Sequence, residues 1–182
     1  MSFAPALPFS GYAGWTFLKR TAASQQAVLN AQPEMKRDEA YFRDKIGTIN
    51  TAAELVADRR LLKVALGAFG LEGDLNSKAF IRKVLEEGTL RDGTLANKLA
   101  DKQYQKLSSA FGFGDFAVPR SKLSDFPEKI IAAYRARQFE VAVGAQNGDL
   151  RLALNLEREL SSIAARSTSS EDAKWFTIMG NA

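Results

Sequence analysis

A stretch of this sequence occurs twice, and this internal repeat limits the folds that the chain can adopt. Five residues of the first copy match five of the second at a shift of 43 positions: Thr51, Ala53, Val56, Ala57 and Asp58 match Thr94, Ala96, Leu99, Ala100 and Asp101. The shift falls to 42 and then 41 further along, so two single-residue deletions separate the copies. Because repeats of about 40 to 47 residues are typical of helix pairs, we expect an all-α, multi-helix domain with two helix-turn-helix units of about 43 residues.

The repeated residues are structural types and not chemically reactive ones. In the two copies they are Asp58, Phe69 and Gly70, and then Asp101, Phe111 and Gly112. The aspartates stand where a helix could begin, so we predict that they cap helices; a paired functional site is the alternative. The phenylalanines are predicted to be core anchors and not a ligand slot, and the glycines are predicted to end helices. The repeat therefore indicates a scaffold and names no reaction.

Prolines, glycines and polar runs predict one helical domain with a segment at each end. Residues 1–14 hold two prolines and two glycines and are predicted to be a flexible arm, with no regular helix before Gly14. Residues 15–166 are predicted to form a single all-helical domain. Residues 167–182 are a linker followed by the apolar residues Trp175, Phe176, Ile178 and Met179. Since an apolar, aromatic segment rarely forms a free end, we expect the native chain to continue past residue 182.

Apolar periodicity predicts where the helices lie. The spacing of Trp15, Leu18, Ala22, Gln25 and Leu29 predicts a helix whose narrow stripe packs on its own domain or on a partner helix. Residues 33–46 are predicted to form a second helix, and Thr51 with Glu54 has the form of a capping box. Ser77 is predicted to cap a helix that ends at Gly88.

A long helical hairpin is predicted after the second copy of the repeat. Its first helix follows Asp125 and its second follows Gly148. The apolar positions expected to pack within this hairpin are Ile130, Tyr134 and Val141 on the first helix, and Leu152, Leu156, Leu160 and Ile163 on the second.

The residues needed for common catalytic chemistry are scarce. Cysteine and histidine are both absent, which removes disulfides, thiolate sites and the side chain most often used for proton transfer near neutral pH. The nearest paired acids, Glu86 with Glu87 and Glu157 with Glu159, have spacings that do not place both on one helix face. The glycine-rich stretch 67–73 follows a helix and is not followed by Gly-Lys-Ser/Thr, as a phosphate loop would be. We predict no catalytic, cofactor-binding or metal-binding residues.

Charge and hydropathy limit the partners. The net charge is +4, but the 25 basic residues are scattered along the chain, which argues against a nucleic-acid partner because such partners select a basic face or stripe. No run reaches the roughly 18 apolar residues of a membrane helix. The first residues also lack the pattern of a cleaved secretory signal.

Several longer motifs resemble a known family. They are Gly14-Trp15, residues 17–21 with Gln25, 41–43 with Ile46, 58–62, 65–66, 68–71, 99–101, Tyr104, 110–113, Tyr134, 139–140 and 175–180. Over nearly its whole length, the chain resembles a bacterial family of unknown function encoded among flagellar genes. The resemblance implies a flagellar setting and a flagellar protein as partner. It implies no catalytic residues.

We therefore expect a non-catalytic, flagellum-associated structural or assembly protein that acts through helix–helix contacts. Its candidate partner-binding residues are Trp15, Leu18, Leu29, Trp175 and Phe176. A cytoplasmic export chaperone or regulator of a flagellar subunit is the alternative, and an enzyme of unknown reaction is a distant third. The expected location is cytoplasmic or flagellum-associated.

Overall fold

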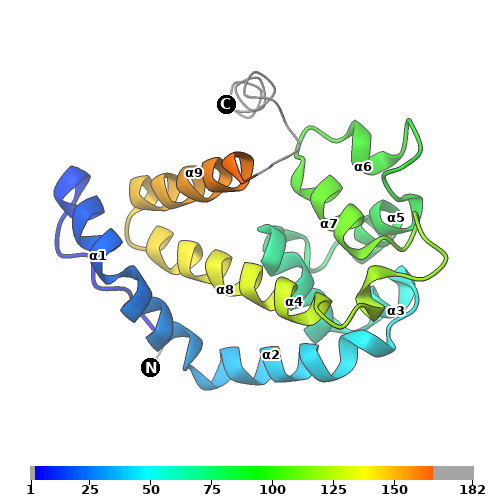
Figure 1. Cartoon of the computed structure of the whole chain (residues 1–182), viewed down its shortest axis with the longest axis horizontal. Coiled ribbons are helices and arrows are strands. Elements are labelled where there is room, and N and C mark those ends of the chain that lie inside the picture. The colour runs from blue at the N-terminus through cyan, green and yellow to red at the C-terminus, as the bar shows by residue number, and fades with distance from the viewer. Residues whose placement is uncertain (1–2, 166–182) are drawn as a thin grey trace. The chain divides into compact units, whose positions relative to one another are not determined.

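The structure is a computed structural model that describes residues 3–165 (Figure 1). In that range the chain forms nine α-helices and no strand: α1 (Gly11–Asn30), α2 (Pro33–Lys45), α3 (Ala52–Ala57), α4 (Arg59–Phe69), α5 (Lys78–Glu87), α6 (Leu95–Lys98), α7 (Gln103–Phe111), α8 (Phe126–Gly144) and α9 (Gly148–Ala164). Three short 3-10 helices accompany them: η1 (Ile46–Thr48), η2 (Glu72–Asp74) and η3 (Arg120–Lys122). The predicted all-α class is confirmed for the described residues. No helix among them combines the length and apolar character that crossing a bilayer requires.

The chain divides into two compact units. Unit 1 contains residues 1–25 and 140–182, and unit 2 contains residues 26–139. Each boundary falls inside a helix, the first in α1 and the second in α8. The domain boundaries expected after residues 14 and 166 stay predictions.

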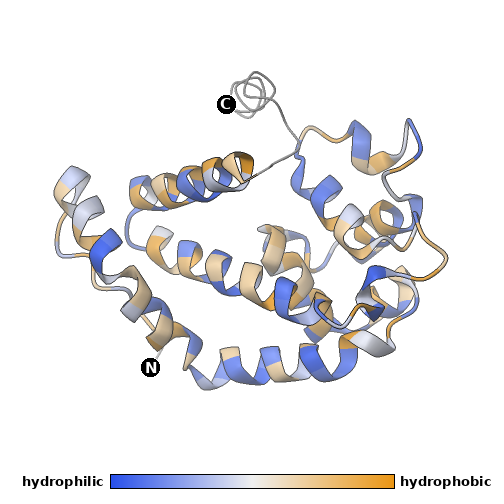
Figure 2. Cartoon of the chain, in the orientation of Figure 1, coloured by the Kyte–Doolittle hydropathy of each residue, from blue (hydrophilic) through white to orange (hydrophobic). Residues whose placement is uncertain are grey.

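Helix α4 is the centre of unit 2. Most of its residues are apolar (Figure 2), and seven of them are buried, while Arg59, Arg60 and Lys63 form its polar side. It packs against α2, α3 and α7. Gly67 lets the ring of Tyr134 on α8 lie against the helix, because a Cβ at this position would stand 2.7 Å from Tyr134 Cε2. Burial of Tyr134 raises the pKa of its hydroxyl to about 12.

Both ends of α4 follow the sequence prediction. Asp58 is the N-cap, and its Oδ1 accepts hydrogen bonds from the backbone N–H of Arg60 at 2.9 Å and of Leu61 at 3.0 Å. Gly70 ends the helix in the left-handed conformation with φ of 75°, which a glycine adopts without the penalty that a Cβ would bring. Phe69, predicted to be a core anchor, is only half-buried.

The second copy of the repeat has the same order of elements with different details. Helix α7 ends at Gly112 with φ of 68°, and Phe111 is fully buried. Asp101 accepts a hydrogen bond from Gln103 N–H at 2.8 Å, although Lys102 occupies the N-cap position. A helix-turn-helix unit of about 43 residues, present twice, stays a prediction.

Two predicted caps differ from the structure. Thr51 caps α3 as expected, accepting from Glu54 N–H at 3.2 Å, but the Glu54 carboxylate returns to Asn50 N–H and not to the cap residue. Ser77 precedes α5 without a side-chain hydrogen bond to that helix. A hydroxyl that fits a cap position can thus be left unused when the backbone around it has another shape, here with ψ of 44° at Ser77.

In unit 1, the segment before α1 is tied to the helices. Gln25 on α1 accepts from Ala6 N–H at 2.8 Å and donates to Ala6 O at 3.2 Å, while Gln146 donates to Pro5 O at 2.7 Å. The helix starts at Gly11, so the expectation of no helix before Gly14 was wrong. Whether the segment is flexible stays a prediction.

The connection between α8 and α9 is three residues long, as in a tight helical hairpin. Arg158 on α9 donates from Nε to Glu140 Oε1 on α8 at 2.6 Å. The packing of the apolar positions is partly corrected, because Val141, Leu152, Leu156 and Leu160 are exposed. Ile130, Tyr134 and Ile163 are buried as predicted.

Candidate interaction surface

The predicted partner-binding residues fall into three groups. Leu18 and Leu29 on α1 are buried, at 0% and 9% exposure, and Trp15 is half-buried beside Lys19, whose Nζ lies 5.7 Å from the centre of the ring. Trp175 and Phe176 lie outside the described residues. A role for any of them in binding a partner stays a prediction, and in this conformation Leu18 offers no side-chain surface.

Buried acids on α2 are paired inside unit 2. Glu39 forms a two-point ion pair with Arg135 on α8, and Asp38 accepts from Lys63 Nζ on α4 at 2.8 Å. Burial disfavours the charge on Lys63, but hydrogen bonds to Asp38 and Glu34 outweigh burial and raise the pKa of the ammonium group. These ion pairs join α2 to α4 and α8. The buried acids of α2 therefore have a structural role as partners of basic side chains.

Two tyrosine–aspartate hydrogen bonds connect the repeated segments to other elements. Tyr41 donates to Asp58 Oδ2 at 2.6 Å, and Tyr104 donates to Asp74 Oδ2 at 2.5 Å. The bond to Asp74 raises the pKa of Tyr104 to about 12, so its hydroxyl stays protonated and remains a donor near neutral pH. Within residues 3–165, no three acidic, cysteine or histidine side chains gather to hold a metal ion.

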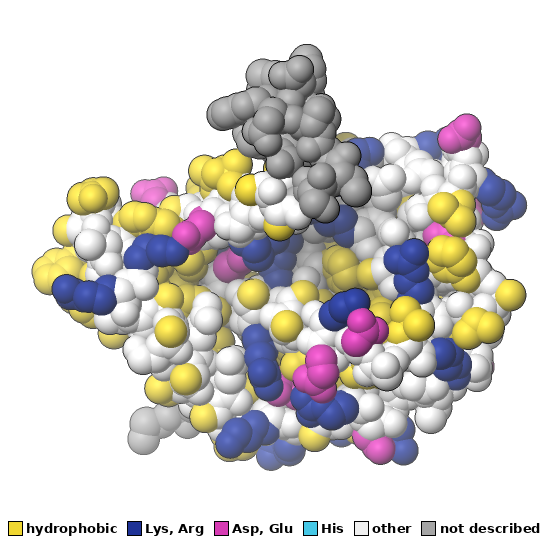
Figure 3. Space-filling model, viewed as in Figure 1, with side chains coloured by type: hydrophobic (Ala, Val, Ile, Leu, Met, Phe, Trp, Pro, Cys, Tyr) yellow, Lys and Arg dark blue, Asp and Glu magenta, His cyan; other side chains and the backbone are white. Residues whose placement is uncertain are grey.

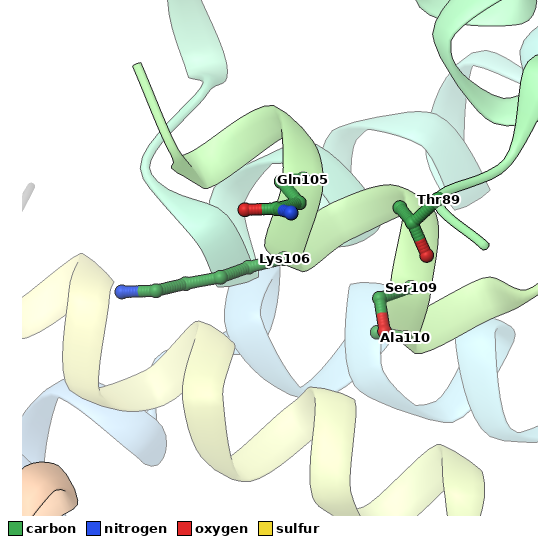
Figure 4. A pocket seen from close by; sticks show the side chains of 5 residues that line it. All are labelled: Thr89, Gln105, Lys106, Ser109 and Ala110. Carbon is green, nitrogen blue, oxygen red and sulfur yellow. The ribbon is translucent and has the colours of Figure 1, made fainter. Parts of the chain in front are cut away.

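A surface hollow of about 410 Å³ lies between α7 and the loop that follows α5 (Figure 4). It is lined by Thr89, Gln105, Lys106, Ser109 and Ala110. Thr89 Oγ1 donates to Asp115 at 2.9 Å and Gln105 Nε2 donates to Asn97 at 2.9 Å. Thr89 therefore links the loop after α5 to Asp115, and Gln105 links α7 to α6.

Asp115 clamps the loop after α5 to the loop after α7. Its Oδ1 accepts from Thr89 N–H at 2.7 Å and from Leu90 N–H at 3.0 Å. Although burial alone would raise it, these amide donors and the Thr89 hydroxyl lower the pKa of Asp115. The loops touch so closely that a Cβ on Gly88, which has φ of 71°, would stand 2.2 Å from Asp115 Oδ1.

The clamped loops carry exposed apolar side chains, which we call the loop patch: Leu90, Phe116 and Val118. Their exposures are 68%, 40% and 68%. Asp115 accepts a hydrogen bond from Leu90 N–H and directly precedes Phe116 in the sequence, so it links the two loops that carry these side chains. Arg120 lies 4.8 Å from the centre of the Phe116 ring. Periodicity could not find this patch because its residues lie in loops.

A second apolar surface, the leucine row, consists of Leu152, Leu156 and Leu160 on α9. Hydrophobic side chains are visible along this helix in Figure 3. Leu152 and Leu156 are 67% and 59% exposed. Single exposed leucines are common on protein surfaces, whereas a continuous apolar row marks a contact site more often.

Comparisons with other proteins place the chain in a family. Residues 68–182 match the model of a family described as "Protein of unknown function (DUF1217)". A crystal structure of a structural-genomics protein from Agrobacterium tumefaciens has 31% sequence identity and a TM-score of 0.75, covering 86% of this chain and 70% of that chain. The search of curated proteins found no match. Because the family model matches more than half of its residues, this chain belongs to the DUF1217 family, whose function is unknown.

Proposed function

We propose that this protein is a non-catalytic, flagellum-associated structural or assembly protein that binds a flagellar partner through apolar contacts. The flagellar setting rests on the resemblance of the sequence motifs to a family encoded among flagellar genes. The observation that carries the binding role is the loop patch. Its apolar side chains stay exposed on loops that Asp115 holds in place with three hydrogen bonds.

An ordered apolar patch suits a preformed binding site. Burying an exposed apolar side chain in a contact is favourable by roughly 25 cal/mol for every Å² of apolar surface removed from water. A clamped loop loses less conformational entropy on binding than a free loop would. Exposed apolar residues that are scattered over a surface are common and do not indicate a binding site. Here the loops of Leu90 and Phe116 are linked through Asp115.

The charges around the loop patch define the partner further. Arg91, Arg120 and Lys122 are exposed in the connections after α5 and α7. The exposed acids of these connections are Asp92 and Asp125, and Asp125 is paired with Lys129. Asp115 is already occupied by the loop after α5. A partner helix with an apolar face bordered by acidic residues fits this surface, as in other grooves and patches that receive amphipathic helices.

The test compares purified flagellar basal bodies with matched cytosol by mass spectrometry, using cells that carry the tagged full-length protein. We expect enrichment in basal bodies, loss of that enrichment in Leu90→Asp, and no loss in Val28→Asp. Val28 is a matched control because it is 53% exposed on α1, away from the loop patch in sequence. Far-UV circular dichroism would show that both variants keep their helices.

Other outcomes would contradict the proposal in distinct ways. Recovery only in the cytosol, in a stable complex with a flagellar subunit, would indicate an export chaperone or regulator. Enrichment that Leu90→Asp leaves unchanged would remove the loop patch as the binding surface. Substrate turnover that a single acidic substitution abolished would contradict a non-catalytic role.

A further inference from the structure

The leucine row of α9 lacks a cover among the described residues. Leu152, Leu156 and Leu160 are 67%, 59% and 37% exposed, and their spacing of four residues places them on one helix face. The same helix buries Leu150 and Ile163, each 3% exposed. Leu150 lies on the side of α9 opposite the row, whereas Ile163 follows Leu160 by three residues on the row's own face and is covered. Helix α9 therefore already packs in unit 1, while the row from Leu152 to Leu160 stays exposed.

The chain itself supplies a suitable cover. Four of the five residues 175–179 are apolar, namely Trp175, Phe176, Ile178 and Met179. They lie outside the described residues. The connection that precedes them, residues 166–174, is polar apart from one alanine. An apolar segment attached by a polar connection to the end of an apolar helix face has that face as its nearest available contact.

The length of the connection allows the contact. Nine residues can span up to about 30 Å when extended. The path from the end of α9 back to the far end of the leucine row is 13 residues of helix, or about 20 Å. The segment can therefore reach every leucine of the row without any change in α9.

We propose that residues 175–179 pack on the leucine row of α9 in the same chain. The local concentration of a tethered segment favours this contact over one between separate molecules. The contact uses a different surface from the loop patch. The contact on the leucine row is independent of whether a flagellar partner binds the loop patch.

Tryptophan fluorescence tests the contact directly, because the chain has two tryptophans, Trp15 and Trp175. In a Trp15→Phe background the emission of the full-length protein reports Trp175 alone. We expect shielded, blue-shifted emission that does not depend on protein concentration. Leu156→Asp should shift it toward the emission of free tryptophan and increase quenching by acrylamide severalfold.

The matched control is Leu90→Asp, an exposed leucine of the loop patch, which should leave the emission of Trp175 unchanged. Leu152→Ser provides a second, milder change in the row should Leu156→Asp fail to fold. Circular dichroism checks the helical content of each variant. The assay uses purified protein without a partner, so its failure is distinct from failure of the proposed flagellar role.

Three results would overturn the proposal. Emission typical of a solvent-exposed tryptophan in the Trp15→Phe protein would mean that the segment does not dock. Shielded emission that both row variants leave unchanged would mean that it docks elsewhere. Shielding that appears only with rising concentration, together with a dimer in light scattering, would assign the row to a second copy of the chain.

Discussion

Asp58 holds three groups at once, and this makes it the most informative single side chain of the first repeat copy. One carboxylate oxygen accepts from Arg60 and Leu61 N–H, and the other accepts from the Tyr41 hydroxyl. Burial opposes the charge of the carboxylate, but the Tyr41 bond and the two amides lower the pKa of Asp58. The residue therefore connects the start of α4 to α2.

Replacing Asp58 by alanine should lower the free energy of unfolding by about 1 to 3 kcal/mol, since it removes a helix cap and the partner of a tyrosine hydroxyl. Asp101→Ala is the matched control. Asp101 is exposed and accepts one backbone bond, so its loss should cost less than about 1 kcal/mol. Urea unfolding of both variants measures the difference, and equal losses would show that the Tyr41 bond contributes nothing.

The residue type at a cap could be predicted from the sequence, but its partners could not. Thr94 aligns with Thr51 in the repeat, yet its hydroxyl makes no hydrogen bond to α6 and has no partner in the described part of the chain. Glu87 of α5 accepts from Leu95 N–H at 2.6 Å instead. A carboxylate from another helix thus satisfies a first-turn amide of α6, while the hydroxyl next to that turn stays unused.

At the scale of a helix, α1 shows that the sequence can predict an apolar face without predicting which elements pack on it. The spacing of Trp15, Leu18 and Leu29 gave the helix, and burial of the two leucines shows which face points inward. On α9 an equally regular spacing belongs to the exposed leucine row. Periodicity identifies an apolar face, whereas the element that covers it depends on contacts far apart in sequence.

Leu18→Ala should therefore act on folding. Truncation of a fully buried leucine costs about 2 to 5 kcal/mol, whereas Val28→Ala on the exposed face of the same helix should change stability by about 0.5 kcal/mol or less. Thermal or urea unfolding of the two variants tests this. A loss of partner binding by Leu18→Ala without loss of stability would restore Leu18 as a contact residue.

The clamp between the two loops makes a prediction at the same scale. Asp115→Ala should speed hydrogen exchange at the Thr89 and Leu90 amides and lower the free energy of unfolding by about 1 to 3 kcal/mol, because it leaves two amides and a hydroxyl without their acceptor. Asp92→Ala, an exposed acid in the same loop, should leave both amides protected. Unchanged exchange in Asp115→Ala would show that other contacts order the loop.

At the scale of the whole molecule, ionisable groups define a pH range of constant stability. The pKa values of Glu34, Asp58, Asp115, Asp125 and Glu128 are lowered in the folded chain, mainly by hydrogen bonds that outweigh burial. A carboxylate with a lowered folded pKa contributes stability above its unfolded pKa of about 4. That contribution is lost as the pH falls through the folded pKa.

At alkaline pH the tyrosines limit stability, because their pKa values are raised in the folded chain and not lowered. The pKa of Tyr104 is raised to about 12 by its bond to Asp74, and that of Tyr41 is raised by its bond to Asp58. The protonated hydroxyl is the form that the fold favours. Its contribution is complete below the unfolded pKa of about 10 and is lost as the pH rises through the folded pKa.

Between these limits the chain has no histidine to titrate, so the free energy of unfolding should be nearly constant from about pH 6 to 8 and fall below about pH 4 and above about pH 10. Urea unfolding across this range measures the profile. Asp115→Asn should be less stable than the unaltered protein at neutral pH, and the difference should shrink in acid as Asp115 becomes protonated. A difference that stayed constant down to about pH 2 would show that the charge of Asp115 does not stabilise the clamp.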